Sequence, residues 1–155
     1  IQLRMRVFLD TNILMESITN RSHSIEIARI YNLYKNGVID CYISQGSFYT
    51  ITYLVEAYLK KTESLSKDQR LDKLRNILNN ILLMSDICDI SNEELSKGIW
   101  DANFTDIEDS YQYQNAIAEQ CEYLITLNKK DFYTDNDQIE IVTPEEFIRK
   151  ISSEL

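Results

Sequence analysis

Residues 6–15 read Arg6-Val7-Phe8-Leu9-Asp10-Thr11-Asn12-Ile13-Leu14-Met15. A run of bulky apolar residues, typical of a buried strand, ends abruptly at an acid, a hydroxyl and an amide. An apolar pattern with helical spacing begins directly afterwards. Ligands of open α/β sheets bind just beyond the carboxyl ends of the strands, so this stretch predicts Asp10 at an active-site edge. The alternative is that Asp10, Thr11 or Asn12 only caps the helix, because all three residue types accept backbone N–H bonds there.

Strands and helices are expected to alternate along the rest of the chain. The pattern predicts further strands at 39–44, 84–90, 123–127 and 139–142, with helices between them. The last helix opens at Thr143-Pro144-Glu145-Glu146, a capping box with proline at the first helical position. This alternation predicts an α/β fold, a three-layer sandwich with a mainly parallel sheet of about five strands. The length of 155 residues suits a single domain over residues 1–155.

The composition excludes several kinds of chemistry. His23 is the only histidine, so two-histidine nucleases and histidine-rich metal sites are excluded, and His23 itself is expected to begin a helix. The chain has only three glycines, and their spacing excludes a dinucleotide fingerprint, a phosphate-binding loop and a nucleophile elbow. No apolar run approaches the roughly 20 residues of a membrane span. Cys41, Cys88 and Cys121 lack paired spacing and predict reduced thiols in a cytoplasmic protein.

Acidic residues recur at two further places comparable to that of Asp10. Asp131 follows the strand at 123–127, and Asp106 to Asp109 open a helix. Carboxylates gathered at one edge of a parallel sheet repel one another unless a cation neutralises them. Hard oxygen ligands select Mg²⁺ or Mn²⁺, which can activate water for phosphodiester hydrolysis without any histidine. The alternative for Asp106 is a helix cap with Asp109 as its partner in the first turn.

Three segments resemble the PIN domain family, including its VapC-like toxin ribonucleases. They read F-L-D-T-N-I-L (8–14), D-I-E-D-S-Y-Q-Y-Q-N-A-I-A (106–118) and L-I-T-L-N-K-K-D-F (124–132), within a resemblance that spans about residues 5–150. The resemblance implies a small α/β endoribonuclease that uses Mg²⁺ or Mn²⁺, in many cases the toxin of a toxin–antitoxin pair. It implies Asp10, Asp109 and Asp131 as metal ligands and catalytic residues, with Thr11, Asn12, Thr126 and Asn128 as polar support. RNA is then the substrate, and an antitoxin or a second copy of the chain is the expected protein partner.

One position departs from the family pattern. The family usually has a glutamate about six residues after the serine that ends the second strand, and here Thr50 holds that place. Glu56 lies six residues further on, rotated by about 240° on a helix of roughly 100° per residue. We expect a site of three acids completed by Asp106 or Glu108. The alternatives are a shifted register that uses Glu56, or a weakened PIN fold that binds RNA or protein without cutting.

A phospho-acceptor role for Asp10, as in haloacid dehalogenase-like phosphatases, is a third hypothesis. Those enzymes require a second acid two residues further on, where this chain has Asn12.

The charge is unevenly distributed. The net charge of −9 opposes RNA binding, which rests on phosphate contacts from lysine and arginine. Residues 60–75 nevertheless carry six bases against three acids, and residues 86–122 carry ten acids against one base. We interpret the basic stretch as a solvated helix face, the alternative being a phosphate guide assisted by Lys129 and Lys130. The acidic excess would suit a basic partner such as an antitoxin.

Overall fold

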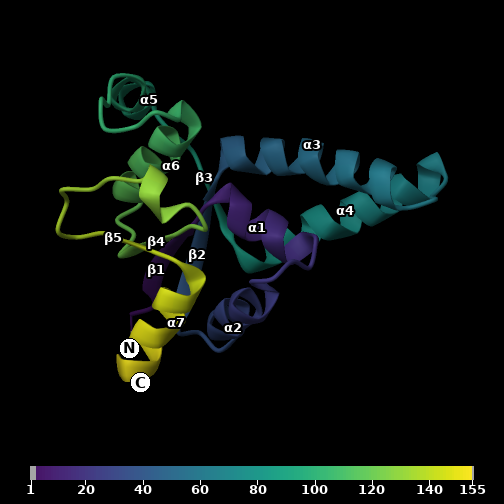
Figure 1. Cartoon of the computed structure of the whole chain (residues 1–155), viewed down its shortest axis with the longest axis horizontal. Coiled ribbons are helices and arrows are strands. Elements are labelled where there is room, and N and C mark those ends of the chain that lie inside the picture. The colour runs from purple at the N-terminus through teal and green to yellow at the C-terminus, as the bar shows by residue number, and fades with distance from the viewer. Residues whose placement is uncertain (1–2, 155) are drawn as a thin grey trace.

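The computed structural model describes residues 3–154, and its strands form one parallel sheet of five strands (Figure 1). These are β1 (Met5–Leu9), β2 (Ile39–Ser44), β3 (Asp86–Cys88), β4 (Tyr123–Ile125) and β5 (Glu140–Val142). All adjacent pairs are parallel, in the order β3-β2-β1-β4-β5. The predicted α/β class is confirmed, and the predicted third and fourth strands are shortened to three residues each.

The centre of the sheet is β1, and the strand order reverses there. Val7 pairs with Cys41 of β2 on one side and with Tyr123 of β4 on the other. At such a switch point the connections leave on opposite faces, and a crevice opens beyond the carboxyl ends of the two strands. Asp10 directly follows β1 and therefore lies at this crevice.

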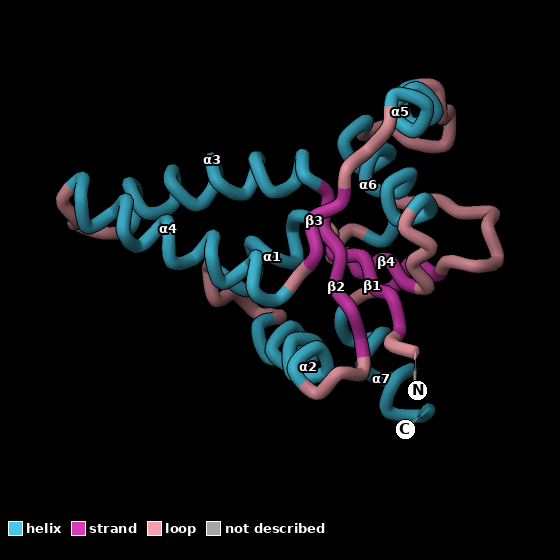
Figure 2. The backbone as a smooth tube through the Cα atoms, turned by 180° about the vertical axis from the view of Figure 1, so that it is seen from behind, coloured by secondary structure: helices cyan, strands magenta, loops and turns pink. Residues whose placement is uncertain are grey.

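Helices cover both faces of the sheet, which gives three layers (Figures 1 and 2). Side chains alternate along β1 because successive residues of a strand point to opposite faces. Val7 and Leu9 join the core formed with α1, α2, α3, α4 and α7, whereas Phe8 joins the core that includes Tyr113 and Ala116 of α6. The helices are α1 (Thr11–Ile18), α2 (Ser24–Lys35), α3 (Gln45–Thr62), α4 (Lys67–Met84), α5 (Asn92–Ile99), α6 (Ile107–Ala118) and α7 (Pro144–Glu154), with a 3₁₀ turn, η1 (Lys129–Asp131).

The helices α3 and α4 form a long hairpin whose tip points away from the sheet (Figures 1 and 2). The basic stretch at 60–75 includes this tip. Lys60 forms an ion pair with Glu56, and Lys73 forms one with Glu63. These pairs are exposed and agree with the interpretation of a solvated helix face. The tip does not lie beside the carboxyl edge of the sheet, so it is poorly placed to guide a phosphate there.

The three cysteines are free and buried, as the sequence predicts. Burial raises the pKa of the Cys41, Cys88 and Cys121 thiols to about 12, so they are inert core residues. Among the described residues, no helix combines the length and the apolar character needed to cross a membrane.

Candidate active site

Asp10 is buried at the end of β1, with only 3% of its surface exposed. It occupies the residue before α1, but its side chain makes no capping hydrogen bond. The Thr126 hydroxyl donates to Oδ2 at 2.7 Å, and Nε2 of Gln112 donates to Oδ1 at 2.9 Å. Burial raises the pKa of Asp10, and these two hydrogen bonds oppose the rise because they stabilise the charged form. The carboxylate is thus held in one orientation at the crevice.

Asp109 lies near the start of α6 and is partly buried. Asp106 caps this helix, since its Oδ1 accepts the Asp109 backbone N–H at 3.1 Å, as the capping alternative expects. The pKa of the Asp109 carboxyl is raised to about 7. Burial is the largest cause, and the negative charges of neighbouring acids add to it, namely Asp10, Asp106, Asp131 and Glu108. These carboxylates therefore act on one another electrostatically, although they come from three separate segments of the chain.

Asp131 ends the 3₁₀ turn η1 and is exposed to solvent. Its backbone N–H donates to the carbonyl of Asn128 at 2.9 Å, and the N–H of Asn128 donates to Oγ1 of Thr126 at 3.0 Å. This turn brings Asp131 toward Asp109 from the β4 side. Asn128 contributes to the turn through its backbone, and no hydrogen bond of its side chain is found among the described residues.

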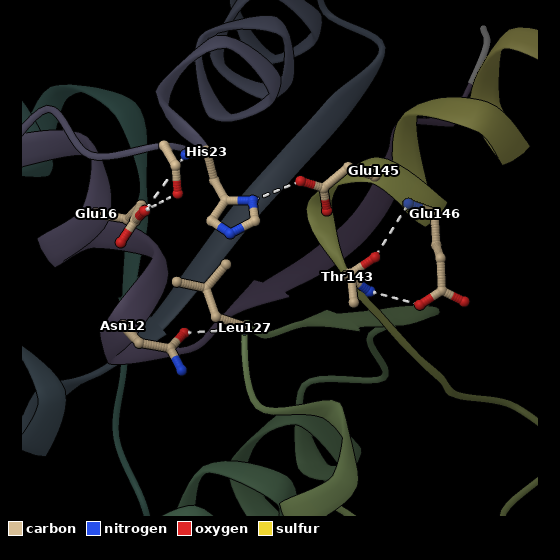
Figure 3. A network of polar contacts seen from close by, with 8 residues as sticks. Asn12, Glu16, His23, Leu127, Thr143, Glu145 and Glu146 are labelled. Carbon is tan, nitrogen blue, oxygen red and sulfur yellow. Dashed lines mark hydrogen bonds and ion pairs between the residues drawn. The ribbon is translucent and has the colours of Figure 1, made fainter.

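Thr11 and Asn12 connect the start of α1 to its surroundings. Oδ1 of Asn12 accepts the backbone N–H of Leu127 at 3.3 Å (Figure 3), and Nδ2 of Asn12 lies 3.5 Å from Oγ1 of Thr126. The Thr11 hydroxyl donates to Oγ of Ser47 at 2.8 Å. The two residues thus tie α1 to the segment directly after β4 and to α3.

Sequence reasoning missed two buried residues beside Asp10. Gln112 is 2% exposed and Ser47 is 1% exposed. Oε1 of Gln112 accepts the backbone N–H of Thr11 at 3.2 Å and the hydroxyl of Ser47 at 3.3 Å. The signal in the sequence is the spacing of three residues between Asp109 and Gln112, which places both on one face of a helix.

Thr50 faces the carboxylates, and Glu56 does not. The side chain of Thr50 on α3 lies beside Glu108 on α6. Burial raises the pKa of Glu108, as do the charges of Asp106 and Asp10, while the neighbouring Thr50 side chain lowers it. Glu56 instead pairs with Lys60 at 3.2 Å. The register with Thr50 nearest the site thus agrees with the geometry, and Glu108 brings an acid to this position.

The donor set suits a divalent cation. Among residues 3–154, no lysine or arginine forms an ion pair with the acids Asp10, Asp106, Glu108, Asp109 or Asp131. Lys129 lies two residues before Asp131 in the sequence, but it forms its ion pair with Glu146 at 2.8 Å. Uncompensated carboxylates that raise one another's pKa gain most from a cation. The five acids nevertheless do not bring three ligand atoms within 4.8 Å of one another, so the cluster is wider than a closed metal cage.

One tighter group of potential ligands lies elsewhere in the described chain. His23, Glu26 and Glu145 offer ligand atoms within 4.8 Å of one another and could hold a metal ion. Nδ1 of His23 contacts Oε1 of Glu145, and Glu16 accepts the backbone N–H of His23 at 3.3 Å (Figure 3). His23 directly precedes α2, as predicted. The ion pair links α2 to α7 across 122 residues of sequence.

Replacement Glu145→Gln is expected to destabilise the protein at pH 6 and to have little effect at pH 9. The hydrogen bond to Glu145 raises the pKa of His23 from 6.5. Burial would raise the pKa of Glu145, but the contact with His23 and the hydrogen bonds from the backbone and Thr143 together outweigh it, so this pKa is lowered from 4.5. The pair is charged above the Glu145 pKa, and it loses its stabilisation as the pH rises through the folded His23 pKa.

Thermal melts at the two pH values check this, with an expected loss of up to about 1 kcal/mol at pH 6 because both side chains are more than a third exposed. Glu140→Gln is the matched control, since it removes a carboxylate that pairs with Lys150 at 2.6 Å and not with a histidine. Equal losses for Glu145→Gln at pH 6 and pH 9 would show that the ionised His23 is not involved.

Comparison with known proteins gives one family and two similar proteins. Residues 6–130 match the model of a family described as the PIN domain. A protein named Ribonuclease VapC1 from Aquifex aeolicus (strain VF5) is 29% identical over 153 residues, which cover 94% of this chain and 94% of that protein. The crystal structure of VapBC2 from Rickettsia felis, bound to a DNA fragment from their promoter, contains a chain with a TM-score of 0.65 and 22% identity. That match covers 88% of this chain and 98% of the solved chain, and it supports the fold.

Proposed function

The chain belongs to the PIN domain family, and we propose that it is a metal-dependent endoribonuclease that acts as the toxin of a toxin–antitoxin pair. The observation that carries the proposal is the group of acids at the carboxyl edge of β1 and β4. This group has no basic partner among residues 3–154, and burial together with the neighbouring carboxylates raises the pKa of Asp109 to about 7. The similarity to a protein named a ribonuclease supports RNA as the substrate.

The residues that would hold Mg²⁺ or Mn²⁺ are Asp10, Asp109 and Asp131, with Asp106 or Glu108 completing the set. When bound, such an ion would lower the pKa of a water molecule and stabilise negative charge on the phosphodiester. Thr126 and Gln112 orient the Asp10 carboxylate and favour its charged form, because each donates to a different oxygen. Thr11 and Asn12 hold the helix start that follows Asp10.

Glu108→Gln is expected to weaken Mn²⁺ affinity and RNA cleavage by about tenfold, the low end of the losses seen on removing residues that support a metal site. Glu108 contacts Thr50 and acts electrostatically on Asp109, so its charge contributes to the cluster. Glu56→Gln is the control, because Glu56 pairs with Lys60 on the exposed side of α3. Calorimetric titration with Mn²⁺ and a cleavage assay measure both variants. A loss in Glu56→Gln as large as that in Glu108→Gln would contradict the assigned register.

The proposed activity is tested by cleavage of a labelled single-stranded RNA. Protein stripped with EDTA should leave the RNA intact, and Mg²⁺ or Mn²⁺ in excess should restore internal cuts. A DNA strand of the same sequence shows whether the activity is specific for RNA. RNA that binds but stays uncut with either ion would overturn the proposal in favour of a PIN fold that serves only as a binding module.

An antitoxin is the proposed protein partner. A cavity of about 420 Å³ lies between α1, α2 and α4, and it is lined by apolar residues that include Leu14, Ile18, Ile77 and Ile81. Such a surface suits the apolar face of a peptide segment.

Both hydrophobic cores pack on the same sheet, which supports one domain over residues 1–155. We propose that the protein acts in the cytoplasm.

A further inference from the structure

Gln112 forms hydrogen bonds with the candidate site that packing of its side chain in the core does not require. Its side chain is buried, and its amide group has partners on both sides. Nε2 donates to Oδ1 of Asp10 at 2.9 Å, while Oε1 accepts the Thr11 N–H at 3.2 Å and the Ser47 hydroxyl at 3.3 Å. Buried polar groups that are fully satisfied hold a single geometry.

The orientation of the Gln112 amide is fixed by its neighbours. The backbone N–H of Thr11 can only donate, so it must face Oε1. Nε2 consequently faces Asp10, which as a carboxylate can only accept. Ser47 strengthens this arrangement, because its hydroxyl also lies 2.8 Å from the hydroxyls of Thr11 and Ser44. Reversing the amide would place a donor against a donor and an acceptor against an acceptor.

The position of Gln112 on α6 links two of the proposed metal ligands. Asp109 precedes it by three residues, one turn earlier on the same face of the helix. The hydrogen bond from Gln112 to Asp10 therefore ties the helix that carries Asp109 to the strand that carries Asp10. Thr126, the residue directly after β4, donates to the other oxygen of Asp10, so two donors from separate parts of the fold define the plane of the carboxylate.

We propose that Gln112 is a positioning residue, which orients the Asp10 carboxylate and sets its separation from Asp109 so that both can bind one divalent cation. Only the kinetic test of this inference rests on the proposed nuclease function. Gln112 itself touches neither the metal nor the substrate in this scheme.

Gln112→Met tests the proposal because methionine keeps the length and volume of the side chain but removes the donor. We expect Mn²⁺ affinity and kcat each to fall by about 10- to 100-fold, as for other residues that orient metal ligands, with KM for RNA unchanged. Gln114→Met is the matched control on the same helix, and it should match the wild type in all three. A Gln112→Met protein that melts earlier but keeps wild-type Mn²⁺ affinity and kcat would overturn the proposal and leave a purely structural role.

An exchange of the two partners tests the contact without metal or RNA. Gln112→Glu alone sets a carboxylate against Asp10 and should lower the melting temperature in EDTA. In the double variant Asp10→Asn/Gln112→Glu, the new amide at position 10 can donate to the new carboxylate at position 112, so the melting temperature should recover above that of Gln112→Glu. Strictly additive effects of the two substitutions would refute the contact. If the wild type cuts no RNA, Mn²⁺ affinity and these melts still decide the role of Gln112, and only the proposed function fails.

Discussion

Asp10→Asn is expected to reduce RNA cleavage by about three orders of magnitude or more. Asparagine has the shape of aspartate but lacks the charge that would hold a divalent cation, and metal assistance of this kind is worth several kcal/mol in the transition state, where about 4 kcal/mol equals a thousandfold in rate. Single-turnover cleavage of a labelled RNA with saturating Mg²⁺ measures the loss. Asp135→Asn, which removes an exposed acid in the loop before β5, is the control and should keep the wild-type rate.

The same variant also separates loss of function from loss of fold. Substitution of Asp10 removes the cost of burying a charge, but it sets a new N–H₂ group among donors that now serve the carboxylate. The Thr126 hydroxyl can rotate to accept from it, so in EDTA the stability should stay within about 1 kcal/mol of the wild type. Added Mg²⁺ should raise the melting temperature of the wild type alone, because ligands stabilise only the state that binds them. Wild-type cleavage by a folded Asp10→Asn protein would end the nuclease assignment.

Asp109→Asn is expected to stabilise the metal-free protein at pH 8 by about 1–2 kcal/mol. The Asp109 pKa is about 7 in the folded state against 3.8 in its ordinary state. An acid with a raised folded pKa destabilises the fold as the pH rises from 3.8 to 7, and the full cost is present above 7. The whole shift would correspond to about 4 kcal/mol at 1.36 kcal/mol per unit, and we reduce it because the side chain is only partly buried and solvent screens its charge.

Urea unfolding in EDTA at pH 8 and pH 4.5 measures this effect. The advantage of Asp109→Asn should be large at pH 8 and should shrink at pH 4.5, where Asp109 is mostly protonated in the folded wild type. Asp135→Asn again provides the comparison with an acid outside the cluster. An Asp109→Asn protein that is less stable than the wild type at pH 8 would mean that the carboxylates do not repel one another.

Much of the fold follows from the sequence because its signals are local. The buried run before Asp10 is a strand, and alternation with helices predicts a parallel sheet, whose carboxyl ends share one edge. That rule places Asp10 and the turn carrying Asp131 together, and the helix cap at Asp106 is readable from its spacing to Asp109. The order of the strands, with β1 at the centre, could not be read from these local signals.

The contacts that the sequence did not predict join residues far apart in the chain. Gln112 reaches Asp10 across 102 residues, and His23 reaches Glu145 across 122. Such contacts depend on how far α6 and α7 are rotated about their axes against the sheet, which hydrophobic spacing leaves open. The sequence shows the excess of positive charge at 60–75, but only the structure shows that the hairpin carrying it points away from the carboxyl edge (Figure 1).

The central claim is that a divalent cation binds the carboxylates at the end of β1, and paramagnetic broadening of backbone amide signals by Mn²⁺ tests it most directly. Trace Mn²⁺ added to ¹⁵N-labelled protein should first broaden the amides next to Asp10, Asp109 and Asp131, and Asp109→Asn should abolish this effect. Broadening confined to the surroundings of His23 and Glu145, and unchanged by Asp109→Asn, would place the metal in the other group of ligands and contradict the account.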